Sequence, residues 1–226
     1  LAGEIQIYFS AGPPLVQMRL SGGDVAITSC AAHKLTSKIM VVPAIQKAAD
    51  LRGKVFAVAN PGSASDFAAK LFLARQGLKA GQDVSLIYSG STSAAFAALV
   101  NGRVQAIFTT APNDLQAAAA GFKSLLELGD LNIPYIGNCS AAMRPYIAKQ
   151  PGRMRAFVAG VTEAIAYIHR RPNEAKAVLE KYTRVSDANI LQHTYDSDTR
   201  FMEPVPRPSI EGTKTVLDHL GVTGRP

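Results

Sequence analysis

The sequence predicts an α/β protein made of two similar lobes. Residues 5–28 and 82–110 each read as an apolar strand, an elbow of small residues, a helix that ends at a glycine, and a second strand. The two segments align without a gap, so that Leu20-Ser21-Gly22 corresponds to Val100-Asn101-Gly102. Residues 54–109 add a regular alternation of strand and helix, which is typical of a parallel, right-handed sheet unit.

The composition fits a folded protein and argues against several functional classes. The 226 residues are 47% apolar and 18% charged, so the chain can bury a sizeable core. No apolar run approaches the ~20 residues needed to cross a bilayer. The 24 Lys and Arg residues exceed the 17 Asp and Glu residues and give a net charge of +7. These basic residues are scattered and no aromatic residues interleave with them, so no nucleic-acid partner is expected.

The first 50 residues contain a compressed version of the repeated unit. A strand at 5–9 leads into a helix that ends at Gly22-Gly23, and 24–28 reads as the next strand. Only residues 29–38 separate it from the apolar strand at 39–42, whereas a parallel crossover normally needs a dozen or more residues. This spacing predicts either an abbreviated lobe or a segment missing from the chain.

The middle of the chain has clearer signals. Residues 54–59 form a near-continuous apolar run, which is typical of a strand buried on both faces. Ser63 and Asp66 have the spacing of a capping box, which predicts that a helix starts there, and Gly77 supplies its C-terminal stop. The other elements expected are strands at 84–88, 104–109 and 124–128, an extended link at 133–136, and helices at 93–100, 114–120, 152–171, 173–182 and 209–220.

Two loops in this stretch carry the features of an anion site. Residues 60–65 and 90–92 each follow a strand and precede a helix, so they offer backbone N–H groups, small hydroxyls and the positive end of a helix. Because open α/β sheets bind ligands at the carboxyl ends of their strands, the two loops are expected to act together. A purely structural explanation remains open, since Ser63 can serve only as a helix cap and Gly90 only as a turn residue.

The sequence carries none of the common catalytic or metal motifs. It has no G-x-S-x-G elbow, no H-E-x-x-H helix and no phosphate-binding glycine loop. Cys30 and His33 form a C-x-x-H pair without a second ligand pair, so no metal and no catalytic residue is expected. Cys30 and Cys139 are the two cysteines, and their spacing leaves open whether they form a disulfide.

The order and spacing of four short motifs carry a family resemblance. They are LRGK at 51–54, NPGS at 60–63, SGST at 89–92 and IPY at 133–135. Together they resemble the solute-binding proteins of ABC transporters, of the nitrate/taurine/sulfonate type, over most of the chain. The resemblance implies the type II periplasmic-binding fold, in which two α/β lobes, each a mainly parallel sheet flanked by helices, enclose a ligand cleft.

The resemblance also implies lobe boundaries and a site. Lobe I would comprise residues 1–50 and 137–226, lobe II residues 51–136, with hinge motion near Val42-Pro43 and Pro134-Tyr135. Family members normally begin with a strand and a helix ahead of this chain's first strand, so lobe I is expected to lack that unit. The residues expected to bind ligand are Ser10, Gly12, Ser29, Asn60, Gly62, Ser63, Ala64, Ser65, Gly90, Ser91, Thr92, Thr109 and Thr110.

The implied function is the capture of a small, anionic organic solute by lobe closure and its delivery to the membrane permease of an ABC transporter. The protein is then expected to be a monomer without a cofactor, periplasmic or otherwise extracytoplasmic, free or lipid-anchored, after removal of a signal peptide. Two alternatives stand beside it: an enzyme of the same fold acting on a pyrimidine-like or small acid substrate, and the effector-sensing domain of a transcription regulator. Turnover of a bound ligand would identify the first, and an upstream DNA-binding helix pair the second.

Overall fold

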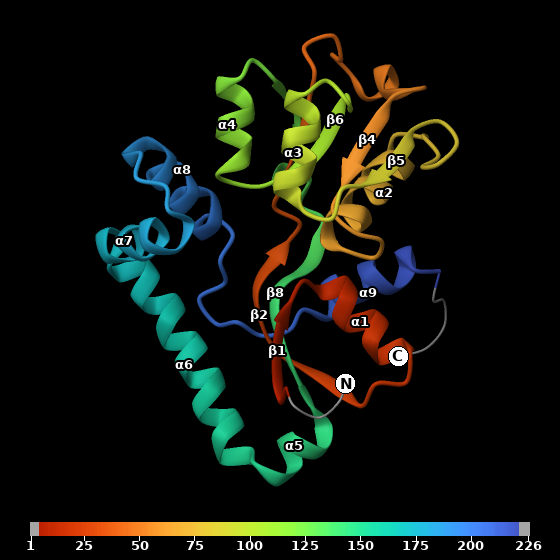
Figure 1. Ribbon diagram of the computed structural model, residues 1–226. Helices are drawn as coiled ribbons and strands as arrows, with labels where there is room; N and C mark the ends of the chain where they lie inside the picture. Colours follow the sequence, from red (N-terminus) through yellow and green to blue (C-terminus); the bar gives the residue numbers. More distant parts are fainter. Residues whose placement is uncertain (1–4, 222–226) are drawn as a thin grey trace. The chain divides into compact units, whose positions relative to one another are not determined.

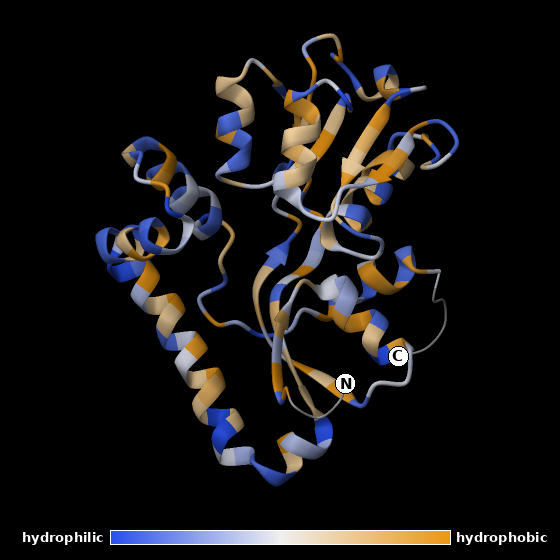
Figure 2. Cartoon of the chain, in the orientation of Figure 1, coloured by the Kyte–Doolittle hydropathy of each residue, from blue (hydrophilic) through white to orange (hydrophobic). Residues whose placement is uncertain are grey.

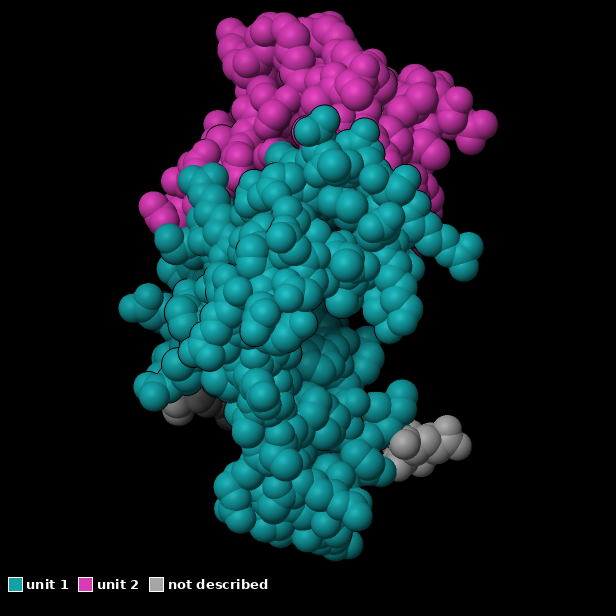
Figure 3. Space-filling model, turned by 90° about the vertical axis from the view of Figure 1, so that its left-hand side faces the viewer, with its two compact units in different colours: residues 1–35, 133–226 teal, residues 36–132 magenta. Residues whose placement is uncertain are grey.

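The computed structural model describes residues 5–221 and divides the chain into two compact units (Figures 1 and 3). Unit 1 holds the residues up to Leu35 and those from Ile133 onward, and unit 2 is Thr36–Asn132. The chain therefore passes between the units twice. The boundaries implied by the resemblance, 50/51 and 136/137, differ from these because strand β3 (Lys38–Val41) is paired within the sheet of unit 2.

The sheet of unit 1 has three strands in the order β1-β8-β2. They are β1 (Ile7–Ser10), β8 (Pro134–Met143) and β2 (Val25–Lys34). Both pairings are antiparallel, so the mainly parallel sheet expected here is wrong for this unit. The reason is that β8 returns from unit 2 and lies between β1 and β2, which run parallel to each other.

Strand β2 explains the short spacing in the first 50 residues. It continues to Lys34, well beyond the predicted end at residue 28, and it pairs with β8 along its length. The chain then enters unit 2, where β3 runs antiparallel to its neighbours. An antiparallel strand needs no crossover helix. The ten-residue strand thus accounts for the spacing that suggested an abbreviated or missing segment.

Unit 2 is a five-stranded sheet in the order β5-β4-β6-β3-β7, flanked by helices. Strands β4, β5 and β6 are parallel, as predicted, whereas β3 and β7 are antiparallel to their neighbours. Their core includes the fully buried Met40, Ala57, Leu99 and Ile107, and Figure 2 shows hydrophobic residues along β4 and β6. The bounds are β4 (Val55–Val58), α2 (Ala64–Arg75), β5 (Ser85–Tyr88), α3 (Thr92–Val100), β6 (Ala106–Thr109), α4 (Asn113–Ala119) and β7 (Lys123–Glu127).

The repeat seen in the sequence has a structural counterpart. Helix α1 (Gly12–Leu20) joins β1 to β2, and α3 joins β5 to β6. In each case the two joined strands are parallel and a third strand lies between them, β8 in unit 1 and β4 in unit 2. The two inserted strands differ in direction, which no feature of the repeat predicts.

The C-terminal part of unit 1 is helical. Pro172 ends one predicted helix and begins the next, where its fixed φ suits a first turn. Helix α8 was not predicted. The Pro-rich segment that follows it is irregular, as expected, and its Pro206 carbonyl oxygen accepts a hydrogen bond from Cys30 N–H of β2 at 2.9 Å. The helices are α5 (Arg144–Lys149), α6 (Pro151–Arg170), α7 (Pro172–Thr183), α8 (Ala188–Thr199) and α9 (Ile210–His219), and 3₁₀ turns lie at Ala48–Leu51 and Leu128–Leu131.

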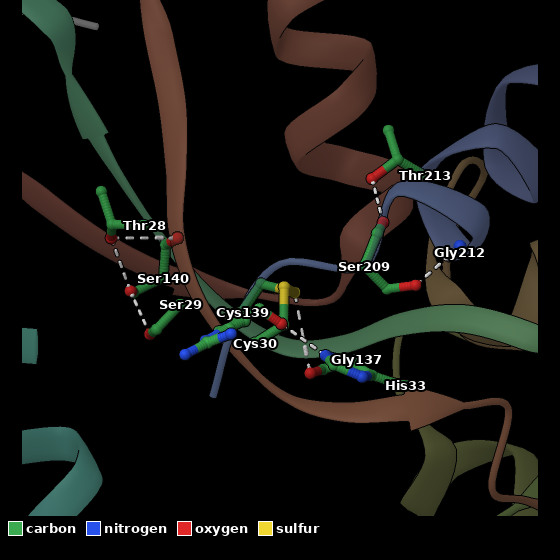
Figure 4. Close-up of a disulfide and its surroundings, with 11 residues drawn as sticks. Thr28, Ser29, Cys30, His33, Gly137, Cys139, Ser140, Ser209, Gly212 and Thr213 are labelled. Atoms are coloured by element: carbon green, nitrogen blue, oxygen red, sulfur yellow. Dashed lines mark hydrogen bonds between the residues drawn. A yellow bond between two sulfur atoms is a disulfide. The ribbon is translucent and has the colours of Figure 1, made fainter. Parts of the chain in front are cut away.

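The two cysteines form a disulfide. Cys30 on β2 and Cys139 on β8 are opposite each other in the sheet register, and both are fully buried (Figure 4). Strand pairing brings together residues that are 109 positions apart in the chain. The question that the sequence left open is therefore settled by the way β8 inserts beside β2.

Candidate functional site

Three loops of unit 2 meet at one edge of its sheet. Strands β4, β5 and β6 are parallel, so the residues that follow them lie at the same carboxyl edge, where open α/β sheets bind ligands. The first two loops are joined directly, because Asn60 Nδ2 donates to Gly90 O at 3.0 Å and Gly90 N–H donates to Ala59 O at 2.8 Å. The structure thus brings residues 60–65 and 90–92 together.

The start of α2 is held by its own hydroxyl groups. Ser63 is the N-cap, and its Oγ accepts from Asp66 N–H at 3.3 Å. Ser65 Oγ accepts from Ala59 N–H at 2.9 Å and lies 3.0 Å from Ser63 Oγ. Both hydroxyls therefore fix the loop. The N–H groups of Ala64 and Ser65, at the first two helical positions, have no acceptor within the helix by its geometry.

A carboxylate of the chain itself occupies the start of α2. The Asp66 side chain is only 4% exposed, and its Oδ2 accepts from Gly62 N–H at 2.8 Å and from Lys70 Nζ at 2.9 Å. Its Oδ1 accepts from Tyr88 OH at 3.2 Å. Only one of the two hydrogen bonds of a capping box is therefore present. Ser63 Oγ accepts from Asp66 N–H, but the Asp66 carboxylate accepts from Gly62 N–H instead of Ser63 N–H. Gly62 consequently does not present its N–H to a ligand.

Lys70 balances the charge of this carboxylate. Partial burial lowers the pKa of the Lys70 ammonium, but the hydrogen bond and Coulomb attraction from Asp66 outweigh that effect, so its pKa is raised. Lys70 thus stays charged near neutral pH. Together, the Lys70 ammonium and the Asp66 carboxylate leave little net positive field at the start of α2 for an external anion.

The start of α3 is different, because it has no acidic residue in its first turn. Ser91 is the N-cap, and its Oγ accepts from Ala94 N–H at 3.1 Å. Gly90 has a φ of +87°, which favours glycine, and a Cβ there would meet nothing within 4 Å. The N–H groups of Thr92 and Ser93 again lack an acceptor within the helix. This helix start is the most favourable place for an anion in unit 2.

The third loop contributes less than expected. Thr109, the last residue of β6, is fully buried and its Oγ1 donates to Thr110 O at 3.3 Å, whereas Thr110 is exposed. Lys38 was missed by the sequence analysis. It pairs with Thr109 across the sheet, and its Nζ lies 2.8 Å from Asp114 Oδ2 and 4.0 Å from Glu127 Oε2. Only the antiparallel direction of β3 puts this lysine at the carboxyl edge, and no local sequence signal gives that direction.

The expected residues of unit 1 have structural roles. Gly12 is buried, and a Cβ there would lie 2.2 Å from Ile136 Cγ1, so glycine allows α1 to approach β8. Ser29 is also buried, with its Oγ 2.6 Å from Ser140 Oγ, and Thr28 Oγ1 lies 2.8 Å from the same atom (Figure 4). A register shift between Ile27 and Ser29 lets both hydroxyls reach Ser140. Ser10 ends β1 opposite Cys139 and is half-buried.

Among residues 5–221, no group of three or more His, Cys, Asp or Glu side chains is placed to hold a metal ion. In the same part of the chain, no helix combines the length and the apolar character that a membrane span requires.

Comparisons with known proteins agree with this fold. The periplasmic aliphatic sulphonate binding protein SsuA from Escherichia coli is 22% identical, with a TM-score of 0.79 over 98% of this chain and 77% of that one. The alkanesulfonate-binding protein SsuA from Xanthomonas axonopodis pv. citri, bound to MOPS, is 18% identical, with a TM-score of 0.80 over 99% and 78%. The desulfurization enzyme DSZB has the same fold at a TM-score of 0.67, with 17% identity over 95% and 77%. No curated protein matches the sequence.

These likenesses confirm the two-lobed periplasmic-binding-protein fold that the sequence predicts. A family model also matches directly, over residues 13–181, which is most of the chain. The chain belongs to the NMT1-like family.

Proposed function

We propose that the protein is an extracytoplasmic solute-binding protein that captures a small organic anion for an ABC importer. The observation that carries the proposal is the start of α3, where Ser91, Thr92 and Ser93 lie at the carboxyl edge of three parallel strands with no acidic residue in the first turn. Helix starts of this kind favour anions through free N–H groups and the helix dipole. The two SsuA proteins of the same fold bind alkanesulfonates, which supports an oxyanion ligand.

The charges around the loops favour a monoanion. Asp66 already places a carboxylate at the start of α2, beside the loop that contacts Gly90. Because Lys70 balances that carboxylate, the start of α2 offers no net positive charge for a second negative charge on a ligand. The proposed ligand class is therefore a sulfonate or carboxylate with one charge and an uncharged organic body, bound at Gly90, Ser91 and Thr92, with Asn60 to Ser65 and Thr110 alongside.

The location and partner follow from the same proposal. The Cys30–Cys139 disulfide is of the kind that persists in oxidising compartments, which supports a periplasmic or surface-anchored protein. Delivery to a membrane permease would follow closure of the two lobes. We propose a hinge where the chain crosses between the units, at residues 35–36 and 132–133, in place of the positions near Val42-Pro43 and Pro134-Tyr135 that the resemblance implies. A monomer is sufficient for this role.

An enzymatic role for the unit 2 site has less support. Unit 2, Thr36–Asn132, contains neither histidine nor cysteine, the side chains most often used as a base and as a thiol nucleophile. Both cysteines of the chain are in the disulfide. The fold is nevertheless shared with DSZB, so turnover is tested directly below.

The decisive variant is Thr92→Pro, measured by calorimetric titration with ethanesulfonate, butanesulfonate, benzoate, sulfate and uncharged butanol. Thr92 is the first residue of α3, where proline is well tolerated, and Ser91 before it is extended (φ −153°, ψ 163°), as proline requires. The substitution deletes one anion-facing N–H and leaves the helix intact. We expect the wild type to bind a monoanion selectively, and Thr92→Pro to bind it about 10- to 100-fold more weakly.

Two controls complete this experiment. Ala64→Pro makes the same change at the start of α2, where Asp66 already supplies a negative charge, and it should weaken binding much less. Thr92→Ala keeps the N–H and should retain most of the affinity. Equal affinity of Thr92→Pro and the wild type would contradict the site, and chemical change of the recovered ligand, checked by NMR, would favour an enzyme.

A further inference from the structure

A second concave surface lies wholly within unit 1. It is an open cavity of about 580 Å³ lined by α6, α7, α8 and Met202. Its volume falls within the range of small-molecule sites, about 300–1,000 Å³. It belongs to a different unit from the α3 site, so it is independent of the proposed function.

A glycine on the long helix α6 forms part of the wall of this cavity. Gly160 lies on α6, and a Cβ built there would meet no atom within 4 Å, so open space lies above the helix backbone. Tyr167 lies two turns further along α6 and is 50% exposed. The hydrophobic residues along α6 are visible in Figure 2. An apolar wall of this kind, left open to solvent, is typical of a ligand site.

The charges of the lining select the kind of ligand. Glu163 on α6 and Asp198 on α8 are both exposed and line the cavity, and its lining contains no Lys, Arg or His. That is unusual for a chain with a net charge of +7. Tyr167, Tyr195 and Met202 add aromatic faces and a polarisable sulfur, which interact well with a cation that has an apolar body.

We propose that this cavity binds a hydrophobic organic cation, such as an alkyl- or arylammonium ion. The apolar part lies over Gly160 against the walls of α6 and α7, and the ammonium group lies at Glu163. An anion of the same shape is disfavoured by the Glu163 carboxylate.

The test compares n-octylammonium with n-octanoate, which share the chain length and differ in the sign of the head group. Calorimetric titration of the wild-type chain should show saturable binding of octylammonium and at least about tenfold weaker binding of octanoate. Shorter butylammonium should bind more weakly, because it covers less apolar surface. Equal or tighter binding of octanoate would overturn the proposal.

Matched variants locate the site. Gly160→Leu fills the cavity and should abolish octylammonium binding. Gly152→Leu is the matched control and should not affect binding, because Gly152 lies on the same helix with equally open space above it but outside the lining. Glu163→Gln should weaken binding about two- to fivefold, as expected for an exposed charge, and Glu180→Gln on α7, outside the lining, should leave it unchanged. Unchanged affinity of Gly160→Leu would overturn the assignment. Binding of a basic amphipathic peptide without binding of octylammonium would also overturn it, in favour of a protein partner.

Discussion

At the scale of single residues, Gly12 is best explained by packing. It was expected to face a ligand, because it follows the elbow after β1. The structure buries it instead, with the side chain of Ile136 and its carbonyl oxygen occupying the space where a Cβ would lie. Gly212 of α9 has the same relation to the backbone of Tyr135, the preceding residue of β8. Glycines therefore set how closely two helices approach one strand.

This packing gives a prediction for Gly12→Ala. The added Cβ would lie 2.5 Å from Ile136 O, so α1 must move away from β8, which we expect to lower the free energy of unfolding by about 1–3 kcal/mol. Gly152→Ala is the control, because a Cβ there meets nothing and alanine is the better helix former by up to ~1 kcal/mol. Urea unfolding would measure both. Equal stability of Gly12→Ala and the wild type would show that the helix adjusts freely.

Lys70 gives a prediction that depends on pH. Its pKa is raised in the folded protein, so its contribution to stability is complete below the unfolded-state value of about 10.4 and is lost as the pH rises through the folded pKa. Lys70→Met should therefore be less stable than the wild type at pH 7, by no more than about 1 kcal/mol because the side chain is 39% exposed. The difference should shrink as the pH rises above about 10.4, through the raised pKa of Lys70 in the folded protein. A stability difference that does not depend on pH would contradict the stabilising role of the Lys70–Asp66 ion pair. An equal loss of stability in Lys79→Met, a variant of an exposed lysine, would contradict it as well.

Local signals predicted most elements but not the interactions between them. Ser63 was identified as a helix cap from its spacing to Asp66, and the structure confirms the cap. The bond from Tyr88 to Asp66 joins different elements, so no spacing along the chain predicts it. Helix α8 was missed because Leu191 and Thr194 are its only buried residues, which is too weak an apolar pattern for recognition.

The starts of α2 and α3 differ in how much they depend on their caps. Ser63 is half-buried and its Oγ contacts Asp66 N–H and Ser65 Oγ, whereas Ser91 is exposed and its Oγ accepts from Ala94 N–H. Ser63→Ala should therefore cost about 1–2 kcal/mol and Ser91→Ala about 0.5–1 kcal/mol. Urea unfolding of the two variants would measure the difference. The reverse order would mean that Ser65 alone holds the loop after β4.

At the scale of the whole molecule, the repeat predicted two similar α/β units, and each unit does contain a strand–helix–strand element. The pairing of distant strands could not be predicted. Strand β8 begins 100 positions after the end of β2 (134 − 34) and inserts between β1 and β2. This insertion makes the sheet of unit 1 antiparallel and shifts the unit boundaries. The same insertion places Cys30 opposite Cys139. Strand order therefore explains both why the compact units differ from the expected lobe boundaries and why the two cysteines are paired.

The disulfide gives a prediction about how the two units unfold. The loop between Cys30 and Cys139 contains all of unit 2, and the cysteines are 109 positions apart. If both units unfold together, the bond restricts a very long loop, and the double variant Cys30→Ala/Cys139→Ala should lose about 4–5 kcal/mol. If unit 2 stays folded when unit 1 unfolds, the folded unit itself constrains most of that loop. The stability lost by the double variant then falls toward the ~3 kcal/mol expected for a short loop.

Calorimetry of the wild type and the double variant would separate these cases. Two transitions, of which only one moves to lower temperature in the variant, would show that unit 2 unfolds independently. One transition that moves as a whole would show that the units unfold together. Because both sulfurs are fully buried, we also expect the folded wild type to keep its disulfide in dithiothreitol until unit 1 unfolds. Rapid reduction under native conditions would mean that the strands β2 and β8 separate locally, and that the bond holds together a pair that is only weakly stable without it.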